Sequence, residues 1–175
     1  MPTTSPASRG ALGILSLTTV STQQTRELAA TMASAALPGD RIALIGPLGA
    51  GKTQFAKGFA VGLGIADVVN SPSFTLMSEY EGRLRLFHQD LYRLAGSDEV
   101  LAGGLLDERQ DEGVTLSEWA DRLDDRLDST RLTVDLEVRH GDARAITLTG
   151  HGAIAERYLA AARAWVAGRA AVTRS

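Results

Sequence analysis

The spacing of hydrophobic and polar positions predicts strands and helices that alternate along most of the chain. Residues 11–20 alternate apolar side chains between two faces, which is typical of a strand, and residues 22–36 repeat them at helical spacing. Residues 41–45 are a short apolar run, as expected for a strand buried on both faces of a parallel sheet. The complete pattern predicts strands at 11–20, 41–45, 74–80, 84–89, 114–116, 131–138 and 145–149, and helices at 22–36, 52–63, 100–108 and 152–167.

Strands that alternate with helices in this way predict a layered α/β fold. The 175 residues fit a single domain, which we expect to cover residues 11–168. Residues 1–10 are rich in Pro, Ser and Thr and have no apolar core, so they favour a disordered leader over a signal peptide. Residues 169–175 are expected to form a flexible tail.

Composition excludes several classes of function. The chain has no cysteine, which rules out a disulfide scaffold, a cysteine nucleophile and thiolate-bound zinc or iron–sulfur centres. A formal net charge of −3 gives no overall basic surface for nucleic acid. No apolar run reaches the roughly 20 residues that span a bilayer, so we expect a cytoplasmic protein without membrane contact.

Lysine is rare in this chain, and its position is informative. The 18 basic residues include only two lysines, Lys52 and Lys57. The first completes the sequence GPLGAGKT at residues 46–53, which matches G-x-x-x-x-G-K-[ST] at every fixed position. A predicted buried strand precedes this motif and a predicted helix follows it. The fold class is therefore expected to be a P-loop NTPase-like layered fold with a central mixed, mainly parallel sheet.

The physical chemistry of this motif points to a nucleotide. Glycines allow backbone conformations in which successive N–H groups converge on phosphate oxygens, and the following helix adds its positive end. Lys52 supplies a mobile charge to the β- and γ-phosphates, and the Thr53 hydroxyl is a ligand for Mg²⁺. We therefore expect ATP and Mg²⁺ as cofactors. Cofactor contacts within and beside the motif are predicted for Gly49, Ala50, Gly51, Lys52, Thr53 and Gln54.

Such a site also needs a carboxylate at the end of a neighbouring strand. Asp90 follows the strand at 84–89, and Glu118 follows the strand at 114–116. The strand positions favour neither acid, and a solvated acid at a strand end is the alternative for each. We predict Lys52, Asp90 and Glu118 as catalytic residues and Thr53, Asp90 and Glu118 as metal ligands.

Three further residues near these acids have open assignments. Ser73, in the sequence SPS, either reaches the γ-phosphate or magnesium or caps a turn. His88 is interpreted as a packed or hydrogen-bonded residue rather than a catalyst. Trp119 either packs in the core or borders the nucleotide, and we include Ser73 and Trp119 among the predicted cofactor contacts.

The motifs occur in one order: GPLGAGKT, then NSPSFTLMSEYEGRLRLFHQDLYRL, then LSEW. This order resembles the bacterial TsaE (YjeE) family, the small P-loop ATPases of tRNA threonylcarbamoyladenosine biosynthesis, over about residues 20–123. The resemblance implies that Lys52 and Thr53 bind ATP and magnesium. It also implies that Asp90 and Glu118 lie around magnesium and the γ-phosphate, and that Ser21 and Thr22 lie near the nucleotide.

The resemblance implies an accessory role in a modification machinery. TsaE-like proteins join TsaB-like and TsaD-like partners, and their ATPase activity, slow alone, supports repeated turnover of the complex without transferring the threonylcarbamoyl group. Contact with tRNA is then expected through the complex. Arg83, Arg85 and Arg93 are candidate tRNA or partner contacts, with solvated surface as the favoured alternative.

The sequence departs from the family pattern at a few positions. Pro47 stands where Asp or Asn is usual, the S-P-T loop is S-P-S, Gln89 replaces an aromatic residue, and Arg109 replaces a tyrosine. None of these changes removes a proposed ligand. Two other functions remain compatible with the motif: a nucleotide-gated scaffold that needs no hydrolysis, and a small-molecule kinase, although no arginine-rich lid is visible.

Overall fold

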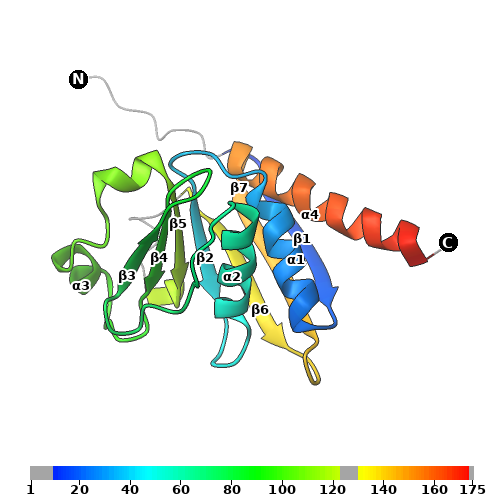
Figure 1. Cartoon of the computed structure of the whole chain (residues 1–175), viewed down its shortest axis with the longest axis horizontal. Coiled ribbons are helices and arrows are strands. Elements are labelled where there is room, and N and C mark those ends of the chain that lie inside the picture. Colours follow the sequence, from blue (N-terminus) through cyan, green and yellow to red (C-terminus); the bar gives the residue numbers. More distant parts are fainter. Residues whose placement is uncertain (1–9, 123–129, 174–175) are drawn as a thin grey trace.

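The computed structural model describes residues 10–122 and 130–173. A seven-stranded sheet in the order β1-β7-β6-β2-β5-β4-β3 forms the centre of the molecule (Figure 1). The strands are β1 (Leu12–Thr19), β2 (Arg41–Ile45), β3 (Met77–Tyr80), β4 (Leu86–Asp90), β5 (Val114–Glu118), β6 (Leu132–Val138) and β7 (Arg144–His151).

The sheet is parallel at its centre and antiparallel at both edges. Strand β2 pairs in parallel with β5 and β6, and β4 pairs in parallel with β5. The pairs β1–β7, β6–β7 and β3–β4 are antiparallel. The predicted layered α/β fold with a mixed sheet is therefore confirmed, although three of the six strand pairs are antiparallel, so only the four central strands are parallel.

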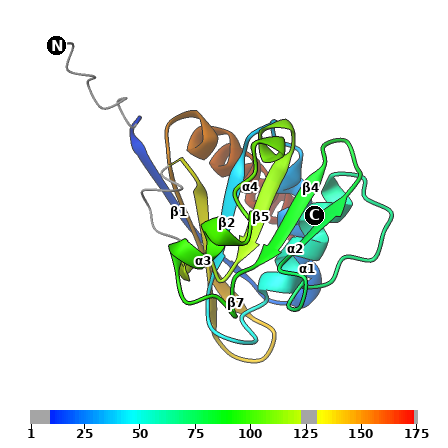
Figure 2. The same ribbon diagram turned by 90° about the vertical axis from the view of Figure 1, so that its left-hand side faces the viewer.

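Three helices cover one face of this sheet (Figure 1). They are α1 (Thr22–Ala33), α2 (Lys52–Gly62) and α4 (Gly152–Thr173). The apolar sides of these helices and the inner face of the central strands form one core cluster, in which Phe59 of α2 packs near Tyr158 of α4. Helix α3 (Ser97–Ala102) lies beyond the β3 edge, at the opposite end of the molecule from α4 (Figure 1), and it is toward the viewer when the molecule is seen from that end (Figure 2).

Helices α1 and α2 pack unusually closely because two glycines of α2 face α1. A Cβ atom at Gly58 would lie 2.2 Å from the Arg26 carbonyl oxygen, and one at Gly62 would lie 2.3 Å from the Ala30 carbonyl oxygen. No side chain fits at either position, so the backbones of the two helices are in direct contact. The helix that follows the phosphate-loop motif is thereby fixed against its neighbour.

Buried polar contacts join α4 to the turn before β2. The Asp40 carboxylate accepts hydrogen bonds from Arg157 at 2.8 and 2.9 Å and from the Tyr158 hydroxyl at 2.8 Å. Arg157 also donates to the Ala35 carbonyl at 2.6 Å, just after α1. Burial, followed by the negative charge of Asp40, raises the pKa of Tyr158 well above its ordinary value. This network connects three segments that are distant in sequence.

The segment between β4 and β5 differs from its prediction. A helix at residues 100–108 was expected, but α3 ends at Ala102 and a separate 3₁₀ helix, η1, covers Glu108–Glu112. The pair Gly103-Gly104 interrupts the helix, because Gly104 has a φ of +66°. The strand expected at 74–80 starts only at Met77, because Leu76 also has a positive φ and bonds back to Pro72.

The C-terminal helix is longer than predicted. It was expected to end at residue 167, but α4 continues to Thr173. Within the expected tail at residues 169–175, the described residues up to Thr173 are therefore helical, and residues 174–175 lie outside the described part of the chain. Arg169 explains part of the extension, because it forms an ion pair with Glu27 of α1 at 3.0 Å and stacks on the Trp165 ring. Of the expected leader at residues 1–10, residues 1–9 lie outside the described part of the chain. No helix within residues 10–122 or 130–173 has the length and apolar character needed to span a bilayer.

Candidate functional site

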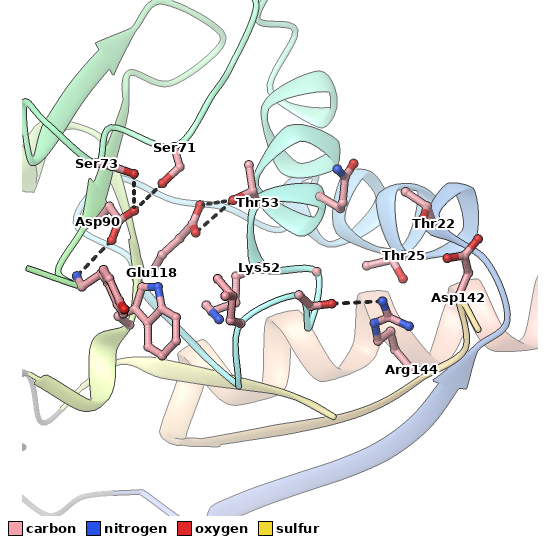
Figure 3. A pocket seen from close by; sticks show the side chains of 16 residues that line it. Thr22, Thr25, Lys52, Thr53, Ser71, Ser73, Asp90, Glu118, Asp142 and Arg144 are labelled. Carbon is pink, nitrogen blue, oxygen red and sulfur yellow. Dashed lines mark hydrogen bonds between the residues drawn. The ribbon is translucent and has the colours of Figure 1, made fainter. Parts of the chain in front are cut away.

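A pocket of about 570 Å³ lies where the central parallel strands end (Figure 3). Strand β2 leads into the phosphate loop, defined here as residues 46–51, while β4 ends at Asp90 and β5 ends at Glu118. All three sequence features line this pocket, as expected for the carboxyl edge of an open α/β sheet. The topology thus joins groups that lie far apart along the chain.

Glycines shape the phosphate loop at two positions in particular. Gly46 has a φ of +150°, and a Cβ there would lie 2.5 Å from the Leu136 carbonyl oxygen on β6. Gly51 has a φ of +101° and immediately precedes α2. The loop therefore turns tightly from β2 into the first turn of α2, where free backbone N–H groups and the helix dipole favour an anion.

Lys52 is the first residue of α2 and is 5% exposed. Its ammonium donates to the Gly46 carbonyl at 2.6 Å and to the Pro47 carbonyl at 2.9 Å. It also lies 3.9 Å from the centre of the Trp119 ring. Burial lowers the pKa of Lys52, and the negative charges of Glu118, Asp121 and Asp90 oppose that shift.

The two predicted acids are direct neighbours across the sheet. Asp90 and Glu118 are paired residues in the parallel ladder of β4 and β5, and both are at most 5% exposed. Glu118 accepts hydrogen bonds from the Thr53 hydroxyl at 3.1 and 3.0 Å. The structure therefore brings the candidate metal ligands Thr53 and Glu118 into contact.

His88, on strand β4, forms a hydrogen bond with Glu118 at the end of β5. Its Nε2 lies 2.8 Å from Glu118 Oε1, and a hydrogen bond to a carboxylate requires the ring proton to be on Nε2. The ring is completely buried, and its Nδ1 has no hydrogen-bond partner within the described residues. This agrees with the interpretation of His88 as a hydrogen-bonded residue.

Asp90 has different partners from Glu118. Its Oδ2 accepts hydrogen bonds from the Ser71 hydroxyl and, at 3.2 Å, from the Ser73 hydroxyl, while its Oδ1 accepts from the Tyr92 backbone N–H at 3.0 Å. Figure 3 shows both serines pointing to this carboxylate. Ser73 thus reaches Asp90, and so does Ser71, which the sequence did not single out as a contact.

The donor atoms around Thr53 suit magnesium bound together with a phosphate group. Thr53, Asp90 and Glu118 offer only oxygen atoms, which Mg²⁺ prefers, and Mg²⁺ usually keeps water and phosphate oxygens in its shell. Among residues 10–122 and 130–173, no group of three or more His, Cys, Asp or Glu side chains could enclose a metal. The oxygen donors of Thr53, Asp90 and Glu118 fit Mg²⁺ by their chemistry, and such an ion would need further ligands from water or a bound group.

Trp119 forms one wall of the pocket. It follows β5 with a φ of +57°, and its ring lies 4.9 Å from the ring of Tyr92. The sequence left open whether Trp119 packs in the core or borders a nucleotide. The ring packs against the small apolar cluster that includes Leu91 and Val100, and it also lines the pocket with Lys52 against its face. Tyr92 lines the same wall and was not predicted.

The start of α1 supplies the opposite side of the pocket. Thr22 and Thr25 line it, whereas Ser21 is not among the described lining residues. The Ser21 hydroxyl instead accepts a hydrogen bond from the Gln24 backbone N–H at 3.1 Å and so caps α1. Ala50, another predicted contact, is completely buried, and its N–H bonds to the Pro47 carbonyl.

Two residues of the β6–β7 hairpin also line the pocket, and sequence reasoning missed both. Asp142 lies at the hairpin turn, and Arg144 reaches the phosphate loop from the start of β7 (Figure 3). No local signal could have identified them, because their position depends on how the hairpin folds against β2.

The three arginines considered as tRNA or partner contacts have intramolecular partners. Arg83 donates to the carbonyls of Ala33 and Ala36 at the end of α1 and beyond it. Arg85 pairs with the acids Glu79 and Glu81. Arg93 lies 4.3 Å from the Phe74 ring, and Phe74 is 84% exposed. Of the three, only Arg93 is associated with an exposed apolar side chain close to the pocket.

Comparisons with known proteins agree on one family. The sequence model of the family described as "Threonylcarbamoyl adenosine biosynthesis protein TsaE" matches residues 19–146. The tRNA threonylcarbamoyladenosine biosynthesis protein TsaE of Bacillus subtilis is 44% identical over 135 residues, which are 77% of this chain and 84% of the relative. The protein of the same name from Treponema pallidum is 41% identical over 110 residues, covering 63% of this chain and 82% of the relative.

A solved structure supports the same relationship. The crystal structure of Bacillus subtilis YdiB superposes with a TM-score of 0.66 and 36% sequence identity. The match covers 91% of this chain and 98% of that one. The similarity therefore extends over the whole layered fold and not only over the phosphate loop.

Proposed function

The chain belongs to the TsaE family of tRNA threonylcarbamoyladenosine biosynthesis proteins, and within that role we propose that it is a magnesium-dependent ATPase. One observation carries this proposal: Thr53 and Glu118 are in contact directly beside Lys52 and the phosphate loop. A hydroxyl, a carboxylate and an ammonium in this arrangement are the groups that phosphoryl transfer requires.

In the proposed reaction, water attacks the γ-phosphate and ADP leaves. When bound, magnesium would supply neutralisation of the phosphate charge. Thr53 and the neighbouring acids would hold it, and Lys52 would exchange its contacts with Gly46 and Pro47 for phosphate oxygens. The free N–H groups at the start of α2 would stabilise the negative charge as the γ-phosphate is transferred.

Glu118 is the best-placed group to orient the attacking water. It is buried, contacts Thr53, and is held by His88 at 2.8 Å, so its position is fixed before a ligand arrives. Asp90 would act at the edge of the same site, through the serines of residues 71–73. In this proposal both acids help to hold magnesium, Glu118 also orients water, and Asp90 also contacts the serines at residues 71 and 73.

We further propose that the chain works with TsaB-like and TsaD-like proteins and meets tRNA through that complex. The net charge of −3 supports indirect contact, because a protein that binds tRNA alone usually presents a basic surface. The exposed Phe74, which packs on Arg93 near the pocket, supports a protein partner on this side.

The test compares Lys52→Ala with Lys57→Ala, the other lysine of the chain and of α2. ATP hydrolysis is measured with and without magnesium, for each protein alone and together with the two partners. We expect hydrolysis by the parent protein and by Lys57→Ala, and its loss in Lys52→Ala. Normal tRNA modification without any ATP hydrolysis by the parent protein would refute the proposal.

A nucleotide-gated scaffold is the second candidate, and the contact of Asp90 with Ser71 and Ser73 favours it specifically. A γ-phosphate linked to this carboxylate through bound magnesium would order residues 71–75 and so create a partner surface without hydrolysis. Glu118→Gln separates the two functions. If hydrolysis is lost but modification continues over many cycles, the scaffold is correct, whereas arrest after one cycle supports the ATPase.

A further inference from the structure

Arg144 binds the phosphate loop from the side of the β6–β7 hairpin. Its Nε donates to the Ala50 carbonyl at 2.8 Å, and its Nη2 donates to the Gly49 carbonyl at 3.1 Å. Its Nη1 donates to the carbonyls of Gly141 and Ala143, each at 2.9 Å. One guanidinium therefore joins two consecutive loop carbonyls to the turn of the hairpin.

Fixing these carbonyls also fixes the loop N–H groups. The peptide bonds of the described residues are trans, so each C=O points opposite to the N–H of the next residue. The bond between Arg144 and the Ala50 carbonyl therefore turns the Gly51 N–H away from the arginine. Gly51 lines the pocket and immediately precedes α2, at a helix start where N–H groups favour phosphate.

The same contacts reduce an electrostatic penalty. Carbonyl oxygens that turned toward the pocket would repel a polyphosphate. Here the Gly49 and Ala50 carbonyls are directed to a permanent positive charge, which also lies beside the pocket. A planar guanidinium can reach the loop and the hairpin simultaneously, whereas the single ammonium of a lysine cannot match all four carbonyls.

We infer that Arg144 is a positioning residue for the phosphate loop, holding its backbone in the conformation that presents N–H groups to the phosphates of a nucleotide. The inference deepens the proposed nucleotide binding and rests on it. Arg144 acts through the loop backbone, and Lys52, Thr53 and Glu118 make their own contacts without it.

The test uses Arg144→Met and Arg144→Lys, with Arg139→Met as the control. Arg139 is in the same hairpin but is 57% exposed and pairs only loosely with Glu137, at 3.5 Å. Affinity for ADP and ATP is measured by calorimetry, and amide hydrogen exchange of residues 49–52 is measured without nucleotide. Thermal unfolding of each variant shows whether the fold is retained.

We expect Arg144→Met to bind both nucleotides about 10- to 100-fold more weakly, because two charge-assisted hydrogen bonds to the loop are lost. Amide exchange of residues 49–52 should become faster, and Arg139→Met should match the parent protein in both measurements. In steady-state hydrolysis the KM should rise while kcat changes little. Arg144→Lys should recover little of the lost affinity, because lysine keeps the positive charge but lacks the planar guanidinium whose N–H groups reach the loop and the hairpin together.

Three results would overturn the inference: unchanged amide exchange in Arg144→Met, unchanged nucleotide affinity in a parent protein that binds, or full recovery in Arg144→Lys. The last would mean that charge alone matters. If Arg144→Met does not fold, Arg144→Lys decides the question in the same measurements. If the parent protein binds no nucleotide, the proposed function fails, and faster exchange in Arg144→Met would still support a role in holding the loop.

Discussion

Asp90 and Glu118 are register partners at the ends of adjacent parallel strands, yet their carboxylates face different neighbours. Glu118 is held between Thr53 and His88 beside α2. Asp90 is held by Ser71, Ser73 and the Tyr92 backbone. One acid is thus connected to the first turn of α2, and the other to the segment that leads from α2 to β3. This difference makes the effects of mutating each acid separable.

Asp90→Asn should loosen the segment at residues 71–73. Asparagine has one acceptor oxygen in place of two, so it cannot accept from both the serine hydroxyls and the Tyr92 N–H, and it has no negative charge to strengthen these bonds. We expect the variant to be less stable by about 1–3 kcal/mol. Amide exchange of residues 66–76 should therefore become faster. Asp67→Asn is the matched control, because Asp67 lies in the same segment and is exposed. Equal exchange in the two variants would contradict the assigned role of Asp90.

Trp119 should report nucleotide binding by its fluorescence. The chain has two tryptophans, so Trp165→Phe leaves only the ring that Lys52 contacts at 3.9 Å. A nucleotide that draws Lys52 away changes the environment of this ring, and the emission should change with the same midpoint as calorimetry. In Trp119→Phe, the remaining Trp165 on α4 should not respond. A response that survives only in Trp119→Phe would refute the placement.

Gly58→Ala should destabilise the protein strongly. The new Cβ would lie 2.2 Å from the Arg26 carbonyl, so α1 and α2 must separate, at a cost of at least about 1–3 kcal/mol. Gly168→Ala in α4 is the control, because a methyl group at that position would have no atom within 4 Å, and alanine favours a helix by about 0.5–1 kcal/mol. Urea unfolding measures both. A Gly58→Ala variant as stable as the parent would contradict the backbone contact.

Stability at high pH should depend on Tyr158. Its pKa is raised in the folded protein by burial and then by the charge of Asp40, so the folded state keeps the phenol protonated after the unfolded chain has released the proton. The stabilisation is complete below the ordinary tyrosine pKa of about 10 and falls above it by about 1.4 kcal/mol per pH unit. Tyr158→Phe should therefore show a flatter decline between about pH 9 and 11 in urea unfolding. Parallel curves for the two proteins would refute this coupling.

Much of the site could be predicted because its chemistry is local in the sequence. The loop at residues 46–51 is specified by glycine spacing, and the acids at 90 and 118 follow apolar strands. Hydrophobic runs predict where a buried strand ends, and parallel strands end at a common edge. The strand at 41–45 and the start of the helix at 52 therefore agree with the structure.

The remaining contacts depend on tertiary packing and left no local signal. Arg144 is one of sixteen arginines, and only the folding of the β6–β7 hairpin against β2 brings it to the loop. The early end of α3 depends on the positive φ of Gly104, which a helical pattern of apolar residues does not reveal. The extension of α4 to Thr173 is supported by Arg169, whose partner Glu27 lies on another helix.

The glycine-mediated contact between α1 and α2 makes the wall of the pocket that these two helices form rigid. Within the described residues, the walls formed by the segment at 71–76 and by the β6–β7 hairpin have no such contact between helix backbones. Because the two backbones touch at Gly58 and Gly62, α2 has no room to tilt toward α1. If the chain binds a nucleotide as proposed, we expect structural changes in the segment at 71–76 and the β6–β7 hairpin, which also line the pocket, rather than between α1 and α2. Under the proposed function, a partner that distinguishes nucleotide states would contact these two segments, and the α1–α2 surface would be the same in each state.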